Sequence, residues 1–481
     1  MASDQSRRQF LGSGAKLLGL TVLAGVTPEL LSACGSSASK SSSTTAAAST
    51  PAAASTSSLS GFLKSAGKKY SGTSLNLLCV SSAQASAIQS IVSEFEDLTG
   101  IKVSFSMLAN SAAITKTSVS LDAKSSAYDI YQIQSFYVPQ YVAAGYFVSA
   151  DELKAKSGVT YAGLDLTAYA PSSLSALTDA GHLVALPMFN ATQVVFYRTD
   201  IFKSAKINGI PSTLQQLEQV CAQIHGAGHA AIALRTSIGS TENLFTWTAW
   251  LYNFGGGYYR SYDASTGKYS GPNLSAKESL AAGQLYIDVM RKYGPSGALN
   301  WGVSEVTKAF LSGQVAMIQE GSPFGGTIND PKTSAVAGKV GAFAIPPGPA
   351  GSYYPSAAQG WGVSSYSKNQ EAAWLFSQWA TAPETLLKAT LAADFTAPPT
   401  NSAFSNSAFV KKYDFPGFLN SLKQSYGAAK SSPIGGSYIP SLSNWQAAGQ
   451  QVSTYFNEAI NNQRTLASAF TAADGTLTTY A

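Results

Sequence analysis

The stretch that decides the fold runs from residue 185 to residue 202 and reads Ala185-Leu-Pro-Met-Phe-Asn-Ala-Thr-Gln-Val-Val-Phe-Tyr-Arg-Thr-Asp-Ile-Phe. Two apolar runs, Leu183–Leu186 and Val194–Tyr197, predict two strands, and the polar segment Asn190–Gln193 separates them. A helix is expected near Pro211–Ile224, because Ser and Thr at its start each have a Gln three residues later. Strands followed by a helix predict an α/β protein.

A β-α-β unit is expected upstream of this stretch. Leu75–Val80 is an apolar run, Ala85–Leu98 places its apolar residues on one helical face, and Ile101–Met107 alternates like a half-buried strand. Such a unit requires a sheet that is at least partly parallel. Further strands are expected near 128–134, 230–234, 315–319, 340–345 and 361–364, and further helices near 138–144, 275–293, 369–381, 383–393, 416–429 and 444–463.

Composition limits the kind of molecule and the kind of ligand. The 481 residues exceed one compact core and predict two lobes or domains. Charged residues make up only 12%, about half the usual share, which suits a neutral ligand better than a polyanion. The net charge of +5 is spread along the chain without a basic stripe, so nucleic acid is not an expected partner.

The first 33 residues have the pattern of a signal peptide. Arg7 and Arg8 precede an apolar region that is too short, and too broken by Gly25 and Pro28, to span a membrane permanently. The run around the two arginines is similar to a twin-arginine export signal, and Leu-Ser-Ala-Cys, ending at Cys34, is similar to a bacterial lipobox, whose cysteine is lipidated. The alternative for Cys34 is a small residue near an ordinary cleavage site.

A flexible tether is expected after Cys34. Residues 35–58 are nearly all Ser, Ala and Thr, which cannot form a core. Such a chain spans roughly 25–30 Å. We therefore expect an exported protein held at the cell membrane by lipid, facing the extracellular or periplasmic side.

No cofactor or metal is expected. Without a CxxC pair, Cys79 and Cys221 are either two buried free thiols or a disulfide, and the sequence leaves both possibilities open. His225 and His229 are four residues apart, but the intervening glycines disfavour the helix that a metal site at this spacing needs. Neither a nucleophile elbow nor a P-loop is present.

Several ordered segments resemble one known family. They are the stretch 185–202, Phe310-Leu-Ser-Gly-Gln-Val-Ala-Met leading into Gly321-Ser-Pro-Phe, and Gly360-Trp-Gly-Val-Ser, and the resemblance covers about 70–470. It is to the extracellular solute-binding proteins of bacterial carbohydrate ABC importers, family 1, which includes maltose-, sorbitol- and mannitol-binding lipoproteins.

The resemblance implies a two-lobed periplasmic-binding-protein-like fold of type II, with mixed sheets flanked by helices and a ligand cleft between the lobes. One lobe would be residues 59–188 plus 359–430, and the other 189–358 plus 440–481. The segment Asn190–Gln193 would then lie at a hinge between them.

A sugar or polyol needs aromatic rings for its C–H faces and amides, carboxylates and hydroxyls for its hydroxyl groups, because an unpaired buried polar group costs about 1–3 kcal/mol. Ligands of open α/β sheets lie beyond the carboxyl ends of strands. The tryptophans have an alternative role in the core or at the hinge. The candidate ligand-binding residues are Gln84, Gln134, Tyr137, Asn190, Gln193, Trp247, Trp301, Glu320, Ser322, Phe324, Trp361 and Trp445.

The function expected from these features is capture of a sugar or polyol by a monomer, followed by delivery to the permease subunits of an ABC transporter. Three alternatives stay open. A secreted glycoside hydrolase or lyase would need a second carboxylate opposite Glu320. A surface lectin would bind carbohydrate without feeding an importer. A binder of glycerol phosphate or another anion would need a cation, for which Arg235 is the candidate.

Overall fold

The computed structural model describes residues 58–239, 241–263, 268–427, 438–442 and 444–480. The predictions of a signal peptide, of lipidation at Cys34 and of nearly all the tether fall on residues 1–57 and lie outside the described residues. The described residues belong to one compact unit. None of their helices is long and apolar enough to cross a membrane.

The strands form a mixed sheet in the order β2-β1-β3-β12-β6-β10-β7, with β11 paired to β6 as well. The β1 strand runs parallel to β2 and β3, whereas β12 runs antiparallel to β3 and β6. This arrangement confirms the predicted mixed α/β class. The strands are β1 Ser74–Val80, β2 Lys102–Leu108, β3 Ile130–Gln134, β6 Leu186–Arg198, β7 Ile232–Ala233, β10 Met317–Gly321, β11 Val340–Ala344 and β12 Ser356–Val363.

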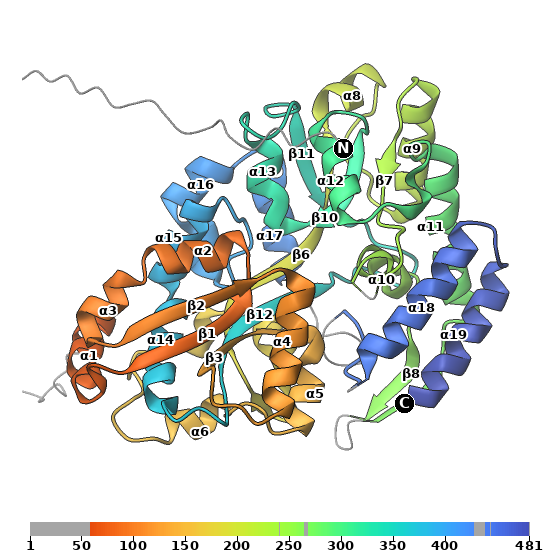
Figure 1. Ribbon diagram of the computed structural model, residues 1–481. Helices are drawn as coiled ribbons and strands as arrows, with labels where there is room; N and C mark the ends of the chain where they lie inside the picture. The colour runs from red at the N-terminus through yellow and green to blue at the C-terminus, as the bar shows by residue number, and fades with distance from the viewer. Residues whose placement is uncertain (1–57, 240, 264–267, 428–437, 443, 481) are drawn as a thin grey trace, which may run out of the picture. The chain divides into compact units, whose positions relative to one another are not determined.

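One strand, β6, joins two packed bodies (Figure 1). Its first half pairs with β12 as far as Thr192, and its second half pairs with β10 from Gln193 onwards and with β11 from Val194. The prediction of two strands separated by a polar segment was therefore wrong. The polar residues continue the strand because their side chains are buried with hydrogen-bond partners, which removes the cost of burying them.

The first body packs helices around β1, β2, β3, β12 and the first half of β6. Its core includes Leu77, Ile130, Trp361 and Phe376, all almost fully buried. The single helix expected over 85–98 is two helices, which break at Ile91. The helices are α1 Leu59–Ala66, α2 Ala83–Ser90, α3 Ser93–Thr99, α4 Asn110–Asp122, α5 Val138–Ala143, α6 Ala150–Lys154, α7 Pro171–Ala176, α14 Gln370–Thr381 and α15 Pro383–Ala393.

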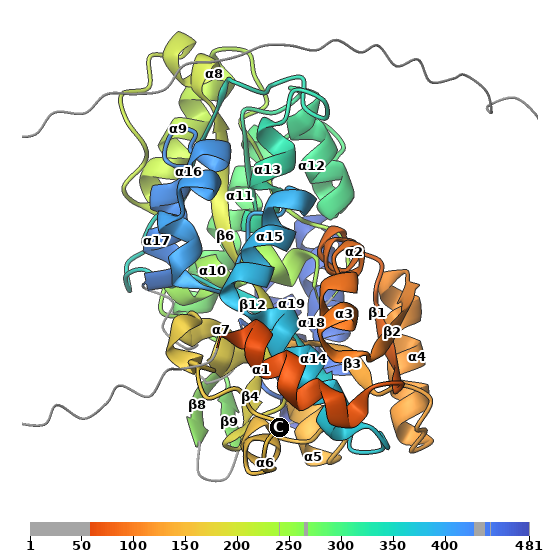
Figure 2. The ribbon, with the colours of Figure 1, turned by 90° about the vertical axis from the view of Figure 1, so that its left-hand side faces the viewer.

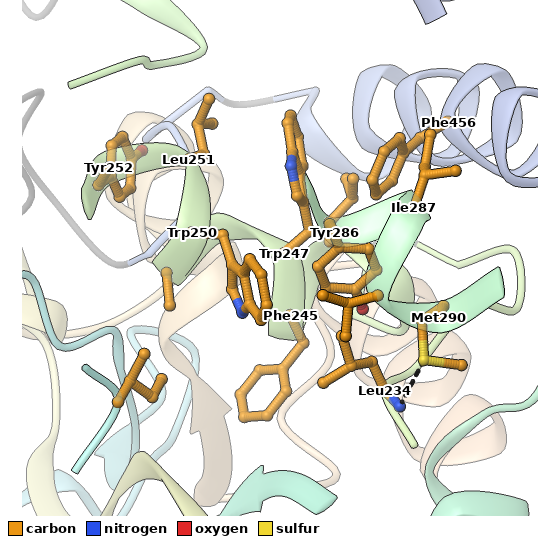
Figure 3. Close-up of a cluster of buried hydrophobic side chains, with 14 of the residues drawn as sticks. Leu234, Phe245, Trp247, Trp250, Leu251, Tyr252, Tyr286, Ile287, Met290 and Phe456 are labelled. Carbon is orange, nitrogen blue, oxygen red and sulfur yellow. Dashed lines mark hydrogen bonds between the residues drawn. The ribbon is translucent and has the colours of Figure 1, made fainter. Parts of the chain in front are cut away.

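The second body surrounds the second half of β6 with β7, β10 and β11. Tryptophans of α10 form the centre of one of its cores (Figure 3). The helices are α8 Thr199–Ser204, α9 Leu214–Gly226, α10 Asn243–Asn253, α11 Lys277–Tyr293, α12 Val303–Leu311, α13 Gly325–Asn329, α16 Ser407–Tyr413, α17 Phe418–Gly427, α18 Trp445–Ile460 and α19 Leu466–Tyr480; the pairs β4 Thr178–Asp179 with β5 His182–Leu183 and β8 Tyr259–Asp263 with β9 Lys268–Pro272 form separate small sheets.

Two helices pack with a different body from the one predicted for their stretch of the chain. The range 359–430 was expected in the first lobe, but α16 and α17 pack with the second body (Figure 2). Phe418 stacks on Phe196 of β6, with ring centroids 5.8 Å apart. Because an amphipathic helix follows the apolar surface it covers, its position along the chain does not reveal which body it joins.

Both cysteines are buried free thiols. Burial raises the pKa of Cys79 to about 12, and it raises the pKa of Cys221 further. Of the two possibilities left open by the sequence, the free thiols are therefore confirmed. Burial with raised pKa values leaves little thiolate at neutral pH, which is the pattern of a structural cysteine.

Two glycines, Gly362 in β12 and Gly475 in α19, test the packing with opposite expected effects on stability. A Cβ on Gly362 would meet Ile133 Cδ1 at 2.1 Å and the Val184 carbonyl oxygen at 2.8 Å, so Gly362→Ala should lower the free energy of unfolding by about 1–3 kcal/mol. A Cβ on Gly475, inside α19, meets nothing within 4 Å, so Gly475→Ala should raise it by about 0.5–1 kcal/mol. Urea unfolding followed by tryptophan fluorescence measures both; equal changes would contradict this packing.

Candidate functional site

A cavity of about 370 Å³ lies between the two bodies. Both bodies contribute to its wall, so a bound solute would contact both. The first body contributes Asn110, Ile114, Gln134, Phe136, Tyr137 and Gln359, and the second contributes Arg235, Gly239, Thr241, Glu242, Phe245, Tyr438, Gln446 and Gln450.

The first-body wall is built at the carboxyl ends of parallel strands, where ligand sites of α/β sheets form. Asn110 follows β2, Gln134 ends β3, and the short turn after β3 carries Phe136 and Tyr137. Gln134 Nε2 donates to Asn110 Oδ1 at 2.9 Å. The resulting wall presents amide groups beside two aromatic rings, which matches the donors, acceptors and C–H surfaces of a polyol or sugar.

The second-body wall is organised by a buried ion pair. Arg235, which follows β7, donates through Nε to Glu320 Oε1 at 2.7 Å and through Nη2 to Glu320 Oε2 at 2.6 Å. Its guanidinium lies over the ring of Phe245, 4.3 Å from the ring centre, and Nη1 donates to the Thr241 carbonyl at 3.0 Å. Paired donors, a stacked ring and a carbonyl hold the guanidinium in one orientation.

The charges around Arg235 do not form an anion site. Burial disfavours its charge, but Glu320 outweighs this effect, and the pKa of Arg235 is raised. Glu242 adds a second negative group, with its Oε2 3.9 Å from Arg235 Nη1. One cation between two carboxylates leaves no positive excess for a phosphate, so Arg235 does not support the glycerol phosphate alternative.

Glu320, which was predicted to contact the ligand directly, is bound to Arg235 in the structure. Its side chain is 0% exposed, and both carboxylate oxygens accept hydrogen bonds from Arg235. The backbone N–H of Gly321 also donates to Oε2 at 3.0 Å. The Glu320 carboxylate therefore neutralises the charge of Arg235 and fixes the orientation of its guanidinium.

Gln193 lies in a network of buried amides rather than at the cavity wall. Its Nε2 donates to the Phe245 carbonyl at 2.5 Å, and its Oε1 accepts from Gln319 Nε2 at 2.6 Å. Gln319 Oε1 in turn accepts from Trp250 Nε1 at 2.7 Å. Because Phe245 and Trp250 belong to α10, this network fixes the helix that carries part of the wall.

Asn190 and Ser322 are buried where segments cross between the bodies. Asn190 Nδ2 donates to Ser172 Oγ at 2.9 Å, and its Oδ1 accepts from Ser356 Oγ at 2.5 Å. Ser322 Oγ accepts from the Thr192 N–H at 3.2 Å. Both side chains tie crossing segments together, and neither lines the cavity.

Three predicted tryptophans lie in the cores. Trp247, Trp361 and Trp445 are at most 2% exposed and do not line the cavity. Figure 3 shows Trp247 beside Phe456, while Phe245 points another way from the same helix; the Trp247–Phe456 ring centroids are 4.6 Å apart. The structure places these rings in the cores, and their role as stacking surfaces for a ligand stays a prediction.

Strand direction explains why Trp361 lies away from the cavity. The β12 strand is antiparallel to β3, and Gln359 pairs with Gln134 at the cavity. After Gln359 the chain therefore runs away from the cavity, and Trp361 lies deeper, beside Phe376. Direction within the sheet depends on strand pairing, which the local sequence does not reveal.

The remaining candidates lie in different places. Gln134 and Tyr137 line the cavity. Gln84 is buried at the start of α2, Trp301 is partly buried after a short helical turn, and Phe324 packs against the second body's core. None of these three residues lines the cavity.

Sequence reasoning missed most of the cavity wall, including Asn110, Phe136, Gln359, Glu242, Phe245, Tyr438, Gln446 and Gln450. Several of these are immediate neighbours of predicted residues. Gln446 follows Trp445, and Phe136 lies between Gln134 and Tyr137. The segments were therefore identified more accurately than the residues within them, because adjacent helical side chains point in different directions.

The described residues contain no group of three or more His, Cys, Asp or Glu side chains that could hold a metal ion. The cavity wall offers amides, aromatic rings, hydroxyl groups and a neutralised arginine. With two α/β bodies joined by β6, this arrangement defines a two-lobed solute-binding fold.

Comparison with known proteins gives the family. The model of the bacterial extracellular solute-binding protein family matches residues 81–386, and the chain belongs to that family. The chain is 23% identical over 439 residues to an erythritol/L-threitol-binding protein of Mycolicibacterium smegmatis, a match covering 88% of this chain and 87% of that protein. It is 28% identical over 318 residues to a mannitol-binding protein of Pseudomonas aeruginosa, covering 63% and 70%.

Solved structures share the fold. A solute-binding protein from Agrobacterium radiobacter in complex with ribitol superposes with a TM-score of 0.72, at 22% identity, over 84% of this chain and 98% of that chain. One from Agrobacterium vitis with bound D-mannitol has a TM-score of 0.70, at 23% identity, over 85% and 98%. These likenesses confirm the predicted two-lobed fold.

The buried ion pair gives a stability prediction. Glu320→Gln leaves the Arg235 charge uncompensated, so the free energy of unfolding should fall by about 3–5 kcal/mol in urea denaturation. The matched control is Glu458→Gln, which breaks the partly exposed Arg464–Glu458 pair and should cost about 0–1 kcal/mol. Similar losses in both variants would contradict the special position of Glu320.

Proposed function

We propose that this protein captures a neutral polyol or sugar outside the cell and delivers it to the permease of an ABC importer. The observation that carries the proposal is the cavity between the two bodies, whose wall combines amides and aromatic rings with an arginine already neutralised by Glu320. The ligands after which the two relatives are named, erythritol or L-threitol and mannitol, support the same class of cargo.

Capture works by closure about the crossing segments. We assign the described residues within 59–192 and 356–393 to one lobe and those within 193–344 and 401–480 to the other, with the hinge at Thr192–Gln193 of β6. The contact of Phe136 with Tyr438, at a centroid distance of 5.3 Å, joins the two sides of the cavity. A ligand that touches both walls stabilises the closed form, because only that form offers all its contacts.

The remaining features of the proposal come from the sequence. The twin-arginine-like segment would direct export, Cys34 would carry lipid, and the Ser/Ala/Thr-rich tether would hold the binding domain near the permease. Walls from a single chain suffice to build the cavity, which supports action as a monomer.

Catalysis is not part of this proposal. Glycoside hydrolysis needs two carboxyl groups free to act across a cleft. Of the carboxylates around the described wall, Glu320 is bound to Arg235, and Glu242 Oε2 accepts from the Val303 N–H at 3.0 Å. The arrangement therefore favours binding over bond cleavage.

Calorimetric titration tests the cargo. We expect binding within a panel of erythritol, ribitol, mannitol and maltose, and none of glycerol 3-phosphate or amino acids. At about 100 times its dissociation constant, the true ligand should add about 2.7 kcal/mol to the free energy of unfolding. Binding of glycerol 3-phosphate or an amino acid alone would overturn the proposed cargo.

Small-angle X-ray scattering tests the closure. The radius of gyration should fall when the ligand identified by calorimetry is added, because the lobes approach each other about β6. A panel solute that does not bind serves as the control and should leave the radius unchanged. Binding without any change in scattering would show a rigid receptor and contradict the hinge.

A further inference from the structure

Tyr438 carries a buried hydroxyl group that makes no hydrogen bond within the described part of the chain. Its side chain is 0% exposed. Other buried tyrosines of the same body are satisfied: the hydroxyl of Tyr258 pairs with Thr248 Oγ1 at 2.7 Å, and that of Tyr286 donates to the Arg235 carbonyl at 2.7 Å. An unsatisfied buried hydroxyl costs stability, so phenylalanine would suit the fold better at this position.

Tyr438 lies at the cavity between the two bodies, where its hydroxyl group could meet a ligand. The residue lines the cavity, and its ring packs edge-on between Phe136 of one wall and Phe245 of the other, at centroid distances of 5.3 and 5.4 Å. Burial raises the pKa of Tyr438 well above its usual value, while the nearby charge of Arg235 acts in the opposite direction. The hydroxyl is thus neutral and lies within reach of the Arg235 charge.

Other unpaired groups lie elsewhere. The indole nitrogens of Trp247 and Trp445 also make no hydrogen bond with the described residues. Neither tryptophan lines the cavity, whereas Tyr438 does. Tyr438 therefore combines a polar atom that is unsatisfied among the described residues with a place in the wall between the two bodies.

Arg235 has unused donors at the same wall. A guanidinium has five N–H groups. Three hydrogen bonds, two to Glu320 and one to the Thr241 carbonyl, account for three of them among the described residues. The two others make no hydrogen bond in that part of the chain, and the nearest carboxylate beyond Glu320, that of Glu242, is 3.9 Å from Nη1, while Arg235 lines the cavity.

We propose that the Tyr438 hydroxyl and the unused N–H groups of Arg235 form one subsite, which binds a pair of neighbouring hydroxyl groups of a neutral ligand. Glu320 is the positioning residue of this subsite, because it orients Arg235 and offsets its charge without facing the ligand. The inference rests on the proposed function and adds the residues that select the ligand. A hydroxyl group both donates and accepts, so it satisfies Tyr438 and Arg235 together.

The same arrangement discriminates against anions. Glu320 and Glu242 place two negative groups around the single positive charge of Arg235. A carboxylate ligand in this subsite would meet net negative charge in a buried setting, where repulsion is strong. The subsite therefore selects an uncharged end of the ligand by chemistry and not only by size.

Tyr438→Phe in the whole chain tests the subsite. Titration with erythritol, ribitol and mannitol should give at least a 10-fold higher dissociation constant for whichever probe the unaltered protein binds. The melting temperature without ligand should stay the same or rise, because the variant removes an unpaired buried hydroxyl. The matched control is Tyr258→Phe, which loses a satisfied hydrogen bond; it should melt at lower temperature and bind within 2-fold of the unaltered protein.

Each outcome decides a separate question. Unchanged binding by Tyr438→Phe, or a loss of melting temperature equal to that of Tyr258→Phe, would overturn the subsite and leave the proposed function standing. Absence of binding to every polyol and sugar by the unaltered protein would overturn both. Should Tyr438→Phe not fold, the unaltered protein still decides: ribonate should bind at least 100-fold more weakly than ribitol, and equal affinity would overturn the subsite.

Discussion

The structure depends on one constraint, the continuous backbone pairing of β6 across both halves of the large mixed sheet. Up to Thr192 this strand pairs with β12, and from Gln193 it pairs with β10. A strand shared by two bodies connects them without a long linker, so it keeps the cavity walls in register while a small backbone rotation can change their distance. A polar side chain buried at this crossing needs hydrogen-bond partners. Asn190 has them in Ser172 and Ser356.

The cavity follows from this connection because strand ends of both bodies face it. Gln134 ends β3 on one side, and Arg235 follows β7 on the other. Burial of Arg235 is possible because Glu320 lies on the neighbouring strand β10, where a two-point ion pair can form. The pair converts a charged side chain into a source of fixed hydrogen-bond donors, which suits recognition of hydroxyl groups.

Local sequence patterns were sufficient to predict the positions of many helices and strands. The apolar run at β1, the alternating residues of β2, the strand expected near β3 and the helix expected near α14 all lie close to the predicted positions. Periodicity failed at β6, where Asn190 to Gln193 resembles a loop but is a buried strand. It also could not assign α17 to a body, because the partner of its apolar face lies far away in sequence.

The sequence by itself determined the α/β class, the family resemblance and some of the segments that meet at the cavity, because these depend on local pattern and on the order of motifs along the chain. Only the tertiary structure decided which side chains in those segments reach the cavity. Strand direction buries Trp361 and leaves Gln359 at the wall, and distant packing brings Tyr438 between Phe136 and Phe245. Such placement depends on contacts between residues hundreds of positions apart, and local sequence carries no signal of them.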